Sequence, residues 1–230
     1  MIICFIASLF VAAGALQTTE WNFAGGMPKD CSPRRFTRLI PGKGLAPAQI
    51  ADKNTSPAGV TVTGFVMPDA FEFEAEFVPY VDWTNSADRA AAAAVPRQHM
   101  LWDTMGVNYR PKRKDKGLQI LFDERDGFWK PVIYAGFGDD TCSLSGPQFK
   151  PKKGEAVRFS VRYGSFGRVK WTVNGESETD QMERYEPIVS NPGVRPVIGD
   201  RLLSCYVPFN GIIRKVAVRP LQAEPIAVPS

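Results

Sequence analysis

Histidine and cysteine are scarce in this chain, and their scarcity removes several classes of chemistry. The 230 residues include one histidine, His99, and four cysteines. A zinc site built from several histidines is therefore excluded. The sequence also has no Cys-x-x-Cys pair, no Gly-x-Ser-x-Gly and no glycine-rich loop that would cradle a phosphate, so it offers none of the catalytic motifs that depend on them.

Sequence that favours a helix is almost as scarce. The one credible helical stretch is Ala87–Val95, which Pro96 ends. The 19 prolines and 20 glycines instead favour strands joined by turns, and a hydrophobic content of 44% is enough for a sizeable core. The net charge of +4 is modest, so it permits acidic partners without requiring them. A single all-β domain is the expectation.

The clearest strand signal runs from Val157 to Glu176. Two runs of apolar residues alternate with polar ones at a period of two: Val157, Phe159, Val161 and Tyr163, then Val169, Trp171 and Val173. This period places the apolar set on a core face and the polar set towards solvent. Asn174-Gly175 is a strong hairpin signal, because both turn positions favour a positive φ. The stretch predicts antiparallel sheet that is buried on one face.

Further strands are predicted along the rest of the chain. Residues 118–137 form a second hairpin around the polar turn at 123–127, and other apolar runs lie at 60–66, 71–78, 99–109, 196–198 and 205–218. Short strands spaced by turn residues are typical of two packed antiparallel sheets. The predicted fold class is therefore an all-β, two-sheet antiparallel β-sandwich of the jelly-roll kind.

The amino terminus resembles a signal peptide. Residues 2–13 are an uninterrupted apolar run, followed by a small-x-small pattern that suits cleavage after Ala15; a buried strand or helix is the alternative. The prediction for the mature chain is secreted, periplasmic or extracellular, without a membrane span. Because export permits disulfides, Cys142–Cys205 is the preferred pair, with free thiols as the alternative.

The predicted domain organisation has four parts. After the signal peptide at 1–15, residues 16–59 form an extended segment packed on the domain, with one short strand expected near Trp21–Phe23. Residues 60–219 form the sandwich. Residues 220–230 form a proline-rich tail.

Three glutamates on one predicted strand are the candidate catalytic residues. Glu72, Glu74 and Glu76 alternate with Phe71, Phe73, Ala75 and Phe77, so they share one face of a strand. Paired carboxylates cleave glycosidic bonds, and retaining enzymes hold them about 5–5.5 Å apart. The alternative is that a half-buried strand needs polar residues on its outer face, and glutamate serves.

Candidate ligand-binding residues lie on loops. Lys112, Arg113 and Lys114 belong to a basic run that could bind an acidic polysaccharide, or form a solvated loop. The run lacks interleaved aromatic residues, so no nucleic acid is expected as a partner. Trp83 lies beside a polar loop and is the best candidate for a sugar-stacking platform.

Asp139 and Asp140 are the candidate metal ligands. They follow an apolar strand and offer oxygens that suit Ca²⁺, although two adjacent aspartates are also ordinary in a turn. No other cofactor is expected.

The order of motifs resembles the concanavalin A-like lectin/glucanase fold, in particular bacterial laminin G-like domains. Four pieces carry the resemblance: the aromatic-rich strand of residues 71–79, the Trp-x-Val-Asn-Gly hairpin of 168–175, the strand of 196–199, and the closing Phe-x-Gly-x-Ile strand of 209–218. The resemblance covers roughly residues 60–219 and implies two stacked antiparallel sheets. It departs at Arg214-Lys215, where the family often has an acidic pair.

The resemblance implies a binding or adhesion module for glycans or proteins, sometimes with calcium at the rim. The leading hypothesis is a secreted, non-catalytic module that binds carbohydrate or an extracellular protein. The alternative is a glycoside hydrolase or polysaccharide lyase of the same fold that uses Glu72, Glu74 and Glu76. Glucanases of the fold carry Glu-x-Asp-x-(x)-Glu, and here the middle aspartate is replaced by Glu74, which favours the non-catalytic reading.

Overall fold

The protein is built from strands. The structure, a computed structural model, describes residues 17–47, 57–80, 85, 87, 97–105, 115–164, 167–184, 186–189, 191, 193–202 and 207–222. Its strands, in chain order, are β1 (Thr19–Asn22), β2 (Cys31–Pro33), β3 (Arg38–Ile40), β4 (Gly44–Ala46), β5 (Val60–Val62), β6 (Phe71–Pro79), β7 (Gln98–Asp103), β8 (Lys116–Arg125), β9 (Phe128–Phe137), β10 (Thr141–Ser145), β11 (Val157–Tyr163), β12 (Arg168–Val173), β13 (Glu176–Gln181), β14 (Val197–Ile198) and β15 (Gly211–Pro220).

Several predictions fall on residues that the structure does not describe. The signal peptide, nearly all of the helical stretch 87–95, Trp83, the basic residues 112–114 and Cys205 all lie outside the described ranges. They therefore stay predictions. Within the described ranges, no helix is long and apolar enough to cross a membrane.

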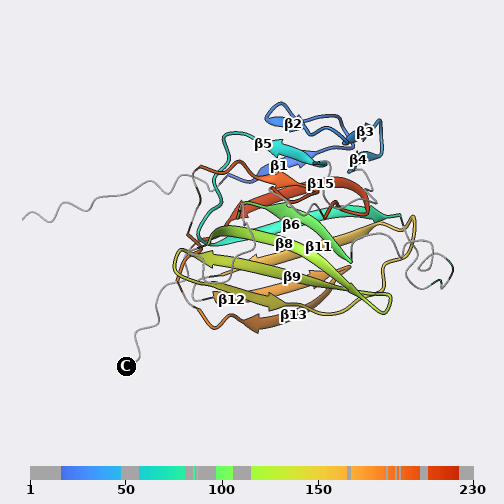
Figure 1. The fold of residues 1–230 in the computed structure, drawn as a ribbon. Coiled ribbons are helices and arrows are strands. Elements are labelled where there is room, and N and C mark those ends of the chain that lie inside the picture. Colours follow the sequence, from blue (N-terminus) through green and yellow to red (C-terminus); the bar gives the residue numbers. More distant parts are fainter. Residues whose placement is uncertain are drawn as a thin grey trace, which may run out of the picture.

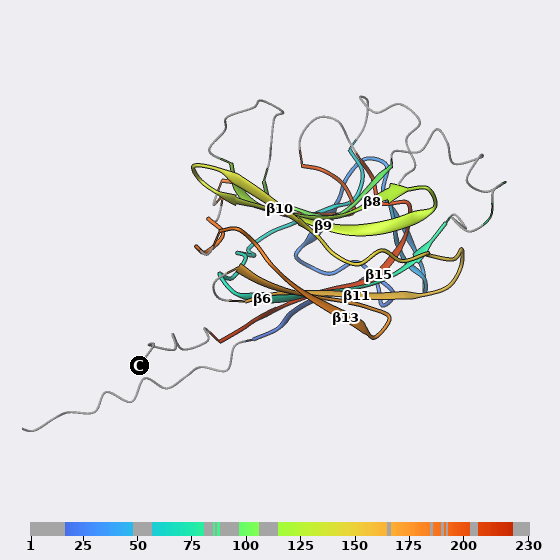
Figure 2. The same ribbon diagram turned by 90° about the horizontal axis from the view of Figure 1, so that it is seen from below.

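The strands form two antiparallel sheets that pack face to face (Figures 1 and 2). Sheet A has eight strands in the order β13-β12-β11-β6-β15-β4-β3, with β1 also paired to β15. Sheet B has seven strands in the order β10-β9-β8-β7-β14-β5-β2. The predicted all-β, two-sheet sandwich is confirmed.

The predicted hairpins form as their turn sequences indicate. In the β11–β12 pair, Val161 lies opposite Trp171, and both are buried. Asn174 and Gly175 have φ values of 51° and 95°, as the favoured two-residue turn requires. Asp126 and Gly127 form the corresponding turn between β8 and β9, with φ values of 54° and 82°.

The amino-terminal segment contributes more to the sheets than its sequence pattern indicates. One strand was expected near Trp21, and β1 is that strand, paired to β15. Three more strands follow: β2 pairs with β5 in sheet B, whereas β3 and β4 extend sheet A beyond β15. These strands have three residues each, too few for a period of two to be recognised.

Aromatic side chains from both sheets meet in the core. Phe77 of β6 is fully buried, and its ring centroid lies 5.2 Å from Phe122, 6.0 Å from Trp129 and 5.0 Å from Phe209. Such pairs add about 0.5–1.5 kcal/mol each beyond the burial of apolar area. This cluster joins β6 of sheet A to β8 and β9 of sheet B.

Phe77→Ala should lower the free energy of unfolding by about 3–5 kcal/mol, because it leaves a cavity between the two sheets. The matched control is Phe36→Ala, since Phe36 is 38% exposed. The control substitution should lower the free energy of unfolding by less than about 1 kcal/mol. Urea unfolding of both variants measures the difference. Equal losses in the two variants would contradict this account of the core.

Candidate functional site

The outer face of sheet A carries the three glutamates. Along β6, buried residues alternate with half-buried ones, so the aromatic side chains point into the core and Glu72, Glu74 and Glu76 point outward, as the sequence predicts. Each carboxylate meets an arginine of β15. Arg219 lies 2.7 Å from Glu74 and 3.5 Å from Glu72, and Arg214 lies 3.1 Å from Glu76.

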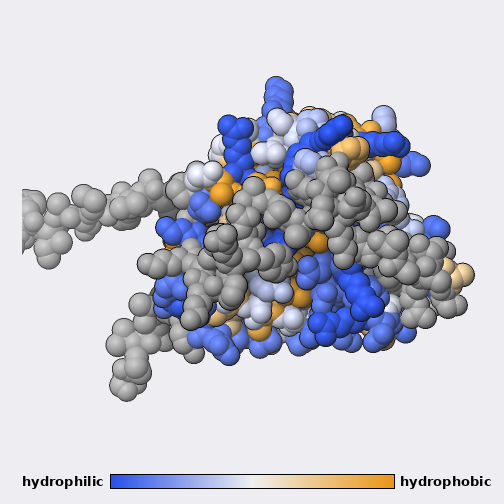
Figure 3. Space-filling model, viewed as in Figure 1, coloured by the Kyte–Doolittle hydropathy of each residue, from blue (hydrophilic) through white to orange (hydrophobic). Residues whose placement is uncertain are grey.

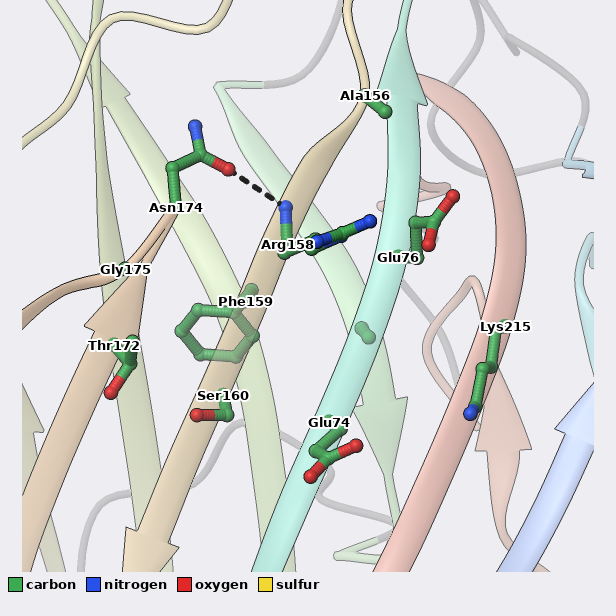
Figure 4. A pocket seen from close by; sticks show the side chains of 11 residues that line it. Glu74, Glu76, Ala156, Arg158, Phe159, Ser160, Thr172, Asn174, Gly175 and Lys215 are labelled. Carbon is green, nitrogen blue, oxygen red and sulfur yellow. Dashed lines mark hydrogen bonds between the residues drawn. The ribbon is translucent and has the colours of Figure 1, made fainter.

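A shallow hollow of about 770 Å³ lies over this face (Figure 4). Its polar lining comes from neighbouring strands and one turn: Glu74, Glu76, Arg158, Ser160, Thr172, Asn174 and Lys215. The Asn174 side chain accepts a hydrogen bond of 2.9 Å from the backbone N–H of Arg158. Two of the candidate catalytic carboxylates therefore do line an open hollow, but arginines already engage them as ion-pair acceptors.

The outer face of sheet B is apolar, unlike that of sheet A. Met100, Leu121, Val132 and Val207 form a buried cluster there, with Tyr134 packed against it. The sheet is bowed, with its hollow side turned away from sheet A (Figure 2). Residues 199–202 and Val207 lie beside β7: the N–H of Gly199 donates to the carbonyl of Leu101 at 3.0 Å, and the carbonyl of Val207 accepts a hydrogen bond of 3.1 Å from the N–H of Met100.

Two buried carboxylates hold that segment in place. Asp200 accepts hydrogen bonds from the N–H groups of Ala58 (2.8 Å), Arg201 (2.7 Å) and Val207 (2.9 Å). Asp103, at the end of β7, accepts bonds from the N–H groups of Met105 (2.8 Å) and Leu202 (2.9 Å). Burial is the main cause that raises the pKa of both carboxyls, to about 6 for Asp200.

Between this segment and the sheet lies a cavity of about 160 Å³, which we call the sheet B pocket. It is lined by residues from four strands and the segments around them: Gln98, Met105, Asp115, Gln119, Leu121, Tyr134, Thr141 and Arg201. Gln119 and Tyr134 are directly opposite each other on β8 and β9. The pocket combines one aromatic ring and an apolar floor with amide, hydroxyl, carboxylate and guanidinium groups.

The surface on this side is mixed in character (Figure 3). Among the coloured atoms of that view, hydrophobic surface shows as scattered patches between hydrophilic side chains rather than as one broad area. A broad apolar area would mark a protein interface. A mixed surface is typical of sites that take polar small molecules through a few placed hydrogen-bonding groups.

The two candidate calcium ligands each accept a hydrogen bond from another group of the protein. Asp139 accepts a hydrogen bond of 3.0 Å from Arg184, and Asp140 accepts one of 2.8 Å from the N–H of Thr141. Ca²⁺ takes six to eight oxygen ligands. In the described part of the chain, no group of three His, Cys, Asp or Glu residues is placed to hold a metal ion. Asp139 and Asp140 thus engage donors of the protein itself, and the calcium site stays a prediction.

Three tryptophans belong to the core rather than to the surface. Trp102, Trp129 and Trp171 are fully buried. Trp171 confirms the expectation that its alternation places it on the core face. Cys142 carries a free thiol and is half-buried. The structure therefore shows no disulfide at Cys142, as the free-thiol alternative expects.

Sequence reasoning did not single out Tyr134, Gln119 or Arg201. The signal was present in β8, where residues 117–122 are buried without interruption. A strand that is apolar on both faces must be covered on both faces. That rule would have directed attention to the outer face of sheet B rather than to the glutamates of β6.

Solved structures similar to this chain share its fold at low sequence identity. The exoplasmic/lumenal domain of VIP36, in its Ca²⁺/Man2-bound form, matches with a TM-score of 0.53 and 13% identity, covering 90% of this chain and 90% of that one. The Emp47p carbohydrate recognition domain matches with a TM-score of 0.52 and 13% identity, covering 87% of this chain and 93% of that one.

The enzymatically active domain of tailspike protein 2 from bacteriophage CBA120 also matches, with a TM-score of 0.55 and 12% identity. The match covers 94% of this chain but 30% of the tailspike chain. No family model and no curated protein matches the sequence. At these identities the comparisons establish the fold, a jelly roll of the lectin type, and they do not single out laminin G-like domains within it.

The buried Asp200 gives a pH dependence with a definite sign. Its pKa is higher in the folded protein (about 6) than its ordinary value of 3.8, because burial disfavours the ionised form. This carboxyl therefore contributes stability that is fully present below pH 4 and is lost as the pH rises through 6, by about 3 kcal/mol in total.

Asp200→Asn should remove this contribution. Urea unfolding at several pH values between 4 and 7 gives the free energy of unfolding of the parent and the variant. The free energy of unfolding of the parent minus that of the variant should fall as the pH rises across this range. The reason is that only the parent carries the titrating carboxyl. A constant difference would contradict the raised pKa.

Proposed function

We propose that this protein is a non-catalytic glycan-binding module whose binding site is the sheet B pocket and the rim around it. The observation that carries the proposal is the Tyr134 ring, half-buried on the hollow face of sheet B among Gln98, Gln119, Asp115, Thr141 and Arg201. Similar folds in VIP36 and Emp47p, one bound to Man2 and one named a carbohydrate recognition domain, support it.

The chemistry of the pocket suits a sugar ring. A pyranose has an apolar face of C–H groups and an edge of hydroxyls, so it needs an aromatic or apolar floor and several hydrogen-bonding groups. Tyr134 and Leu121 supply the floor, and the amides of Gln98 and Gln119 each supply both donors and acceptors. The cavity of about 160 Å³ holds one end of a glycan, with the remainder extending over the rim.

The segment of residues 200–202 keeps the site preorganised. Asp103 and Asp200 fix its backbone by buried hydrogen bonds, and Arg201 thereby reaches the pocket. Preorganisation lowers the entropy that is lost when a ligand binds. The finer assignments remain part of this proposal: a laminin G-like subgroup, secretion after removal of residues 1–15, and an extracellular protein as the alternative partner.

Tyr134→Ala should weaken glycan binding about tenfold, because it removes the stacking surface. A glycan array that includes mannose oligosaccharides identifies a ligand, and isothermal titration then measures its affinity for both proteins. Phe36→Ala removes an exposed aromatic side chain elsewhere and should leave the affinity unchanged. Titrations with calcium and with a chelator determine whether an ion takes part. Absence of binding to any array glycan would contradict the proposal.

A glycoside hydrolase or polysaccharide lyase is the second candidate, because Glu74 and Glu76 line the hollow on sheet A. Arg219 and Arg214 already donate hydrogen bonds to them, so neither carboxylate is free to engage a substrate without breaking an ion pair. We therefore expect the protein to release neither reducing ends nor unsaturated products from polysaccharides. Release that disappears in Glu74→Gln but persists in Tyr134→Ala would favour the enzyme over the binding module.

A further inference from the structure

The charges on the outer face of sheet A are unevenly compensated. The acids of β6 have cations on both sides: Arg219 and Arg214 of β15 form ion pairs with Glu72, Glu74 and Glu76. On the other side, Arg158 and Arg162 of β11 are opposite Glu76 and Glu72 in the strand register. Lys215 of β15 bonds to Glu20 of β1 at 2.8 Å. Strands β6, β15 and β1 thus form a lattice in which cations and anions pair with one another.

Strands β11 and β12 add four more exposed cations to this face. We call Arg158, Arg162, Arg168 and Lys170 the basic stripe; all four alternate with buried core residues and point outward. Among the described residues, no ion pair joins Arg158, Arg162 or Lys170 to a carboxylate. The stripe therefore leaves a net positive charge on this half of the face.

Two of these cations are directly opposite each other. Arg162 of β11 and Lys170 of β12 are partners in the strand register. Like charges in this position destabilise a sheet, whereas an opposite pair would stabilise it. On the other side of Lys170, β13 offers Thr179 rather than an acid. Glu72 of β6 is opposite Arg162 on its other side and relieves part of this repulsion, whereas neither register partner of Lys170 is an acid. An anion bound between Arg162 and Lys170 would relieve the rest.

A cavity lies at this place. Arg162, Arg168, Lys170, Gly164 and Thr179 line a depression of about 330 Å³. Arg158 lines the adjacent hollow on the same face, with Ser160 and Thr172. Along β11, Arg162 is four positions after Arg158, which corresponds to about 13 Å. A ligand must therefore carry more than one acidic group to engage both ends of the stripe.

We propose that the basic stripe binds an anionic polysaccharide through its sulfate or carboxylate groups. The hydroxyls of Ser160, Thr172 and Thr179 alternate with the cations and suit sugar hydroxyls. The large apolar side chains exposed in the described part of the chain are Phe36 and Val66, on other segments. The stripe thus lacks the aromatic platforms that single-stranded nucleic acid needs and the apolar anchors of a protein interface.

This second site is independent of the sheet B pocket, since the two lie on opposite outer faces of the sandwich (Figure 2). A protein with both sites would bind a neutral sugar unit on one face and an acidic chain on the other. Tyr134→Ala should therefore leave binding at the basic stripe intact, and the two proposals fail separately.

The test compares two charge-matched double variants. Arg162→Gln/Lys170→Gln removes two cations of the stripe, and Lys29→Gln/Lys43→Gln removes two exposed cations elsewhere. Affinity for heparin (sulfated), polygalacturonate (carboxylated), dextran (neutral) and single-stranded DNA is measured at low and at high salt. The stripe variant should bind heparin or polygalacturonate at least about tenfold more weakly than the parent, and the control within about twofold. Added salt should weaken the parent's binding.

A stability measurement separates loss of the site from loss of the fold. Because Lys170→Gln removes a like-charge pair, its unfolding midpoint should be equal to or above that of the parent. Equal weakening in both double variants would overturn the proposal, since net charge alone would then explain binding. Dextran binding as tight as heparin binding would overturn it too. If the parent binds DNA more tightly than polysaccharide, and the stripe variant loses that binding, the ligand of the stripe is a nucleic acid and the proposal is overturned.

Discussion

The burial of aromatic side chains between the two sheets is the constraint on which the rest of the structure depends. Phe77, Phe122 and Trp129 meet across the sandwich, and they can do so only if β6, β8 and β9 each keep one register. A slip of one residue would move every side chain of a strand to its other face. The same packing that places Phe77 inside therefore places Glu74 and Glu76 outside, so their position needs no catalytic role to explain it.

The outer faces of the two sheets differ in the residues that they carry. Sheet A has solvent on its outer face, and its exposed residues form ion pairs and a basic stripe. Sheet B has a second apolar cluster on its outer face, to which Val207 contributes. Burying the Asp103 and Asp200 carboxylates is costly, and the five backbone N–H groups that they accept offset part of that cost. The Arg34 guanidinium, 3.9 Å from Asp200, adds an ion pair to these backbone hydrogen bonds.

Much of this fold could be predicted from alternation alone, and most of the site could not. β6, β11 and β12 are half-buried, so their period of two is legible in the sequence. β8 is buried on both faces, and its role in the pocket depends on segments far away in the chain. The pairing of Glu74 with Arg219 spans 145 residues, so no local pattern reveals it. That pairing changes the interpretation of the glutamates from candidate acids to members of an ion-pair lattice.

The cations on the outer face of sheet A differ in the residues that lie opposite them. Acids of β6 are opposite Arg158 and Arg162, an arrangement that stabilises a sheet. Lys170 differs, because its register partners are Arg162 and Thr179. β13 carries acids, but Glu176, Glu178 and Asp180 are opposite Val173, Trp171 and Val169, on the alternate face of the strand. A shift of one residue in β13 would bring those acids beside the cations and cancel the stripe. The observed register instead sets Thr179 and Gln181 opposite Lys170 and Arg168, so the positive charge of the stripe is compensated on the β6 side only. A bound polyanion gives that arrangement a physical reason.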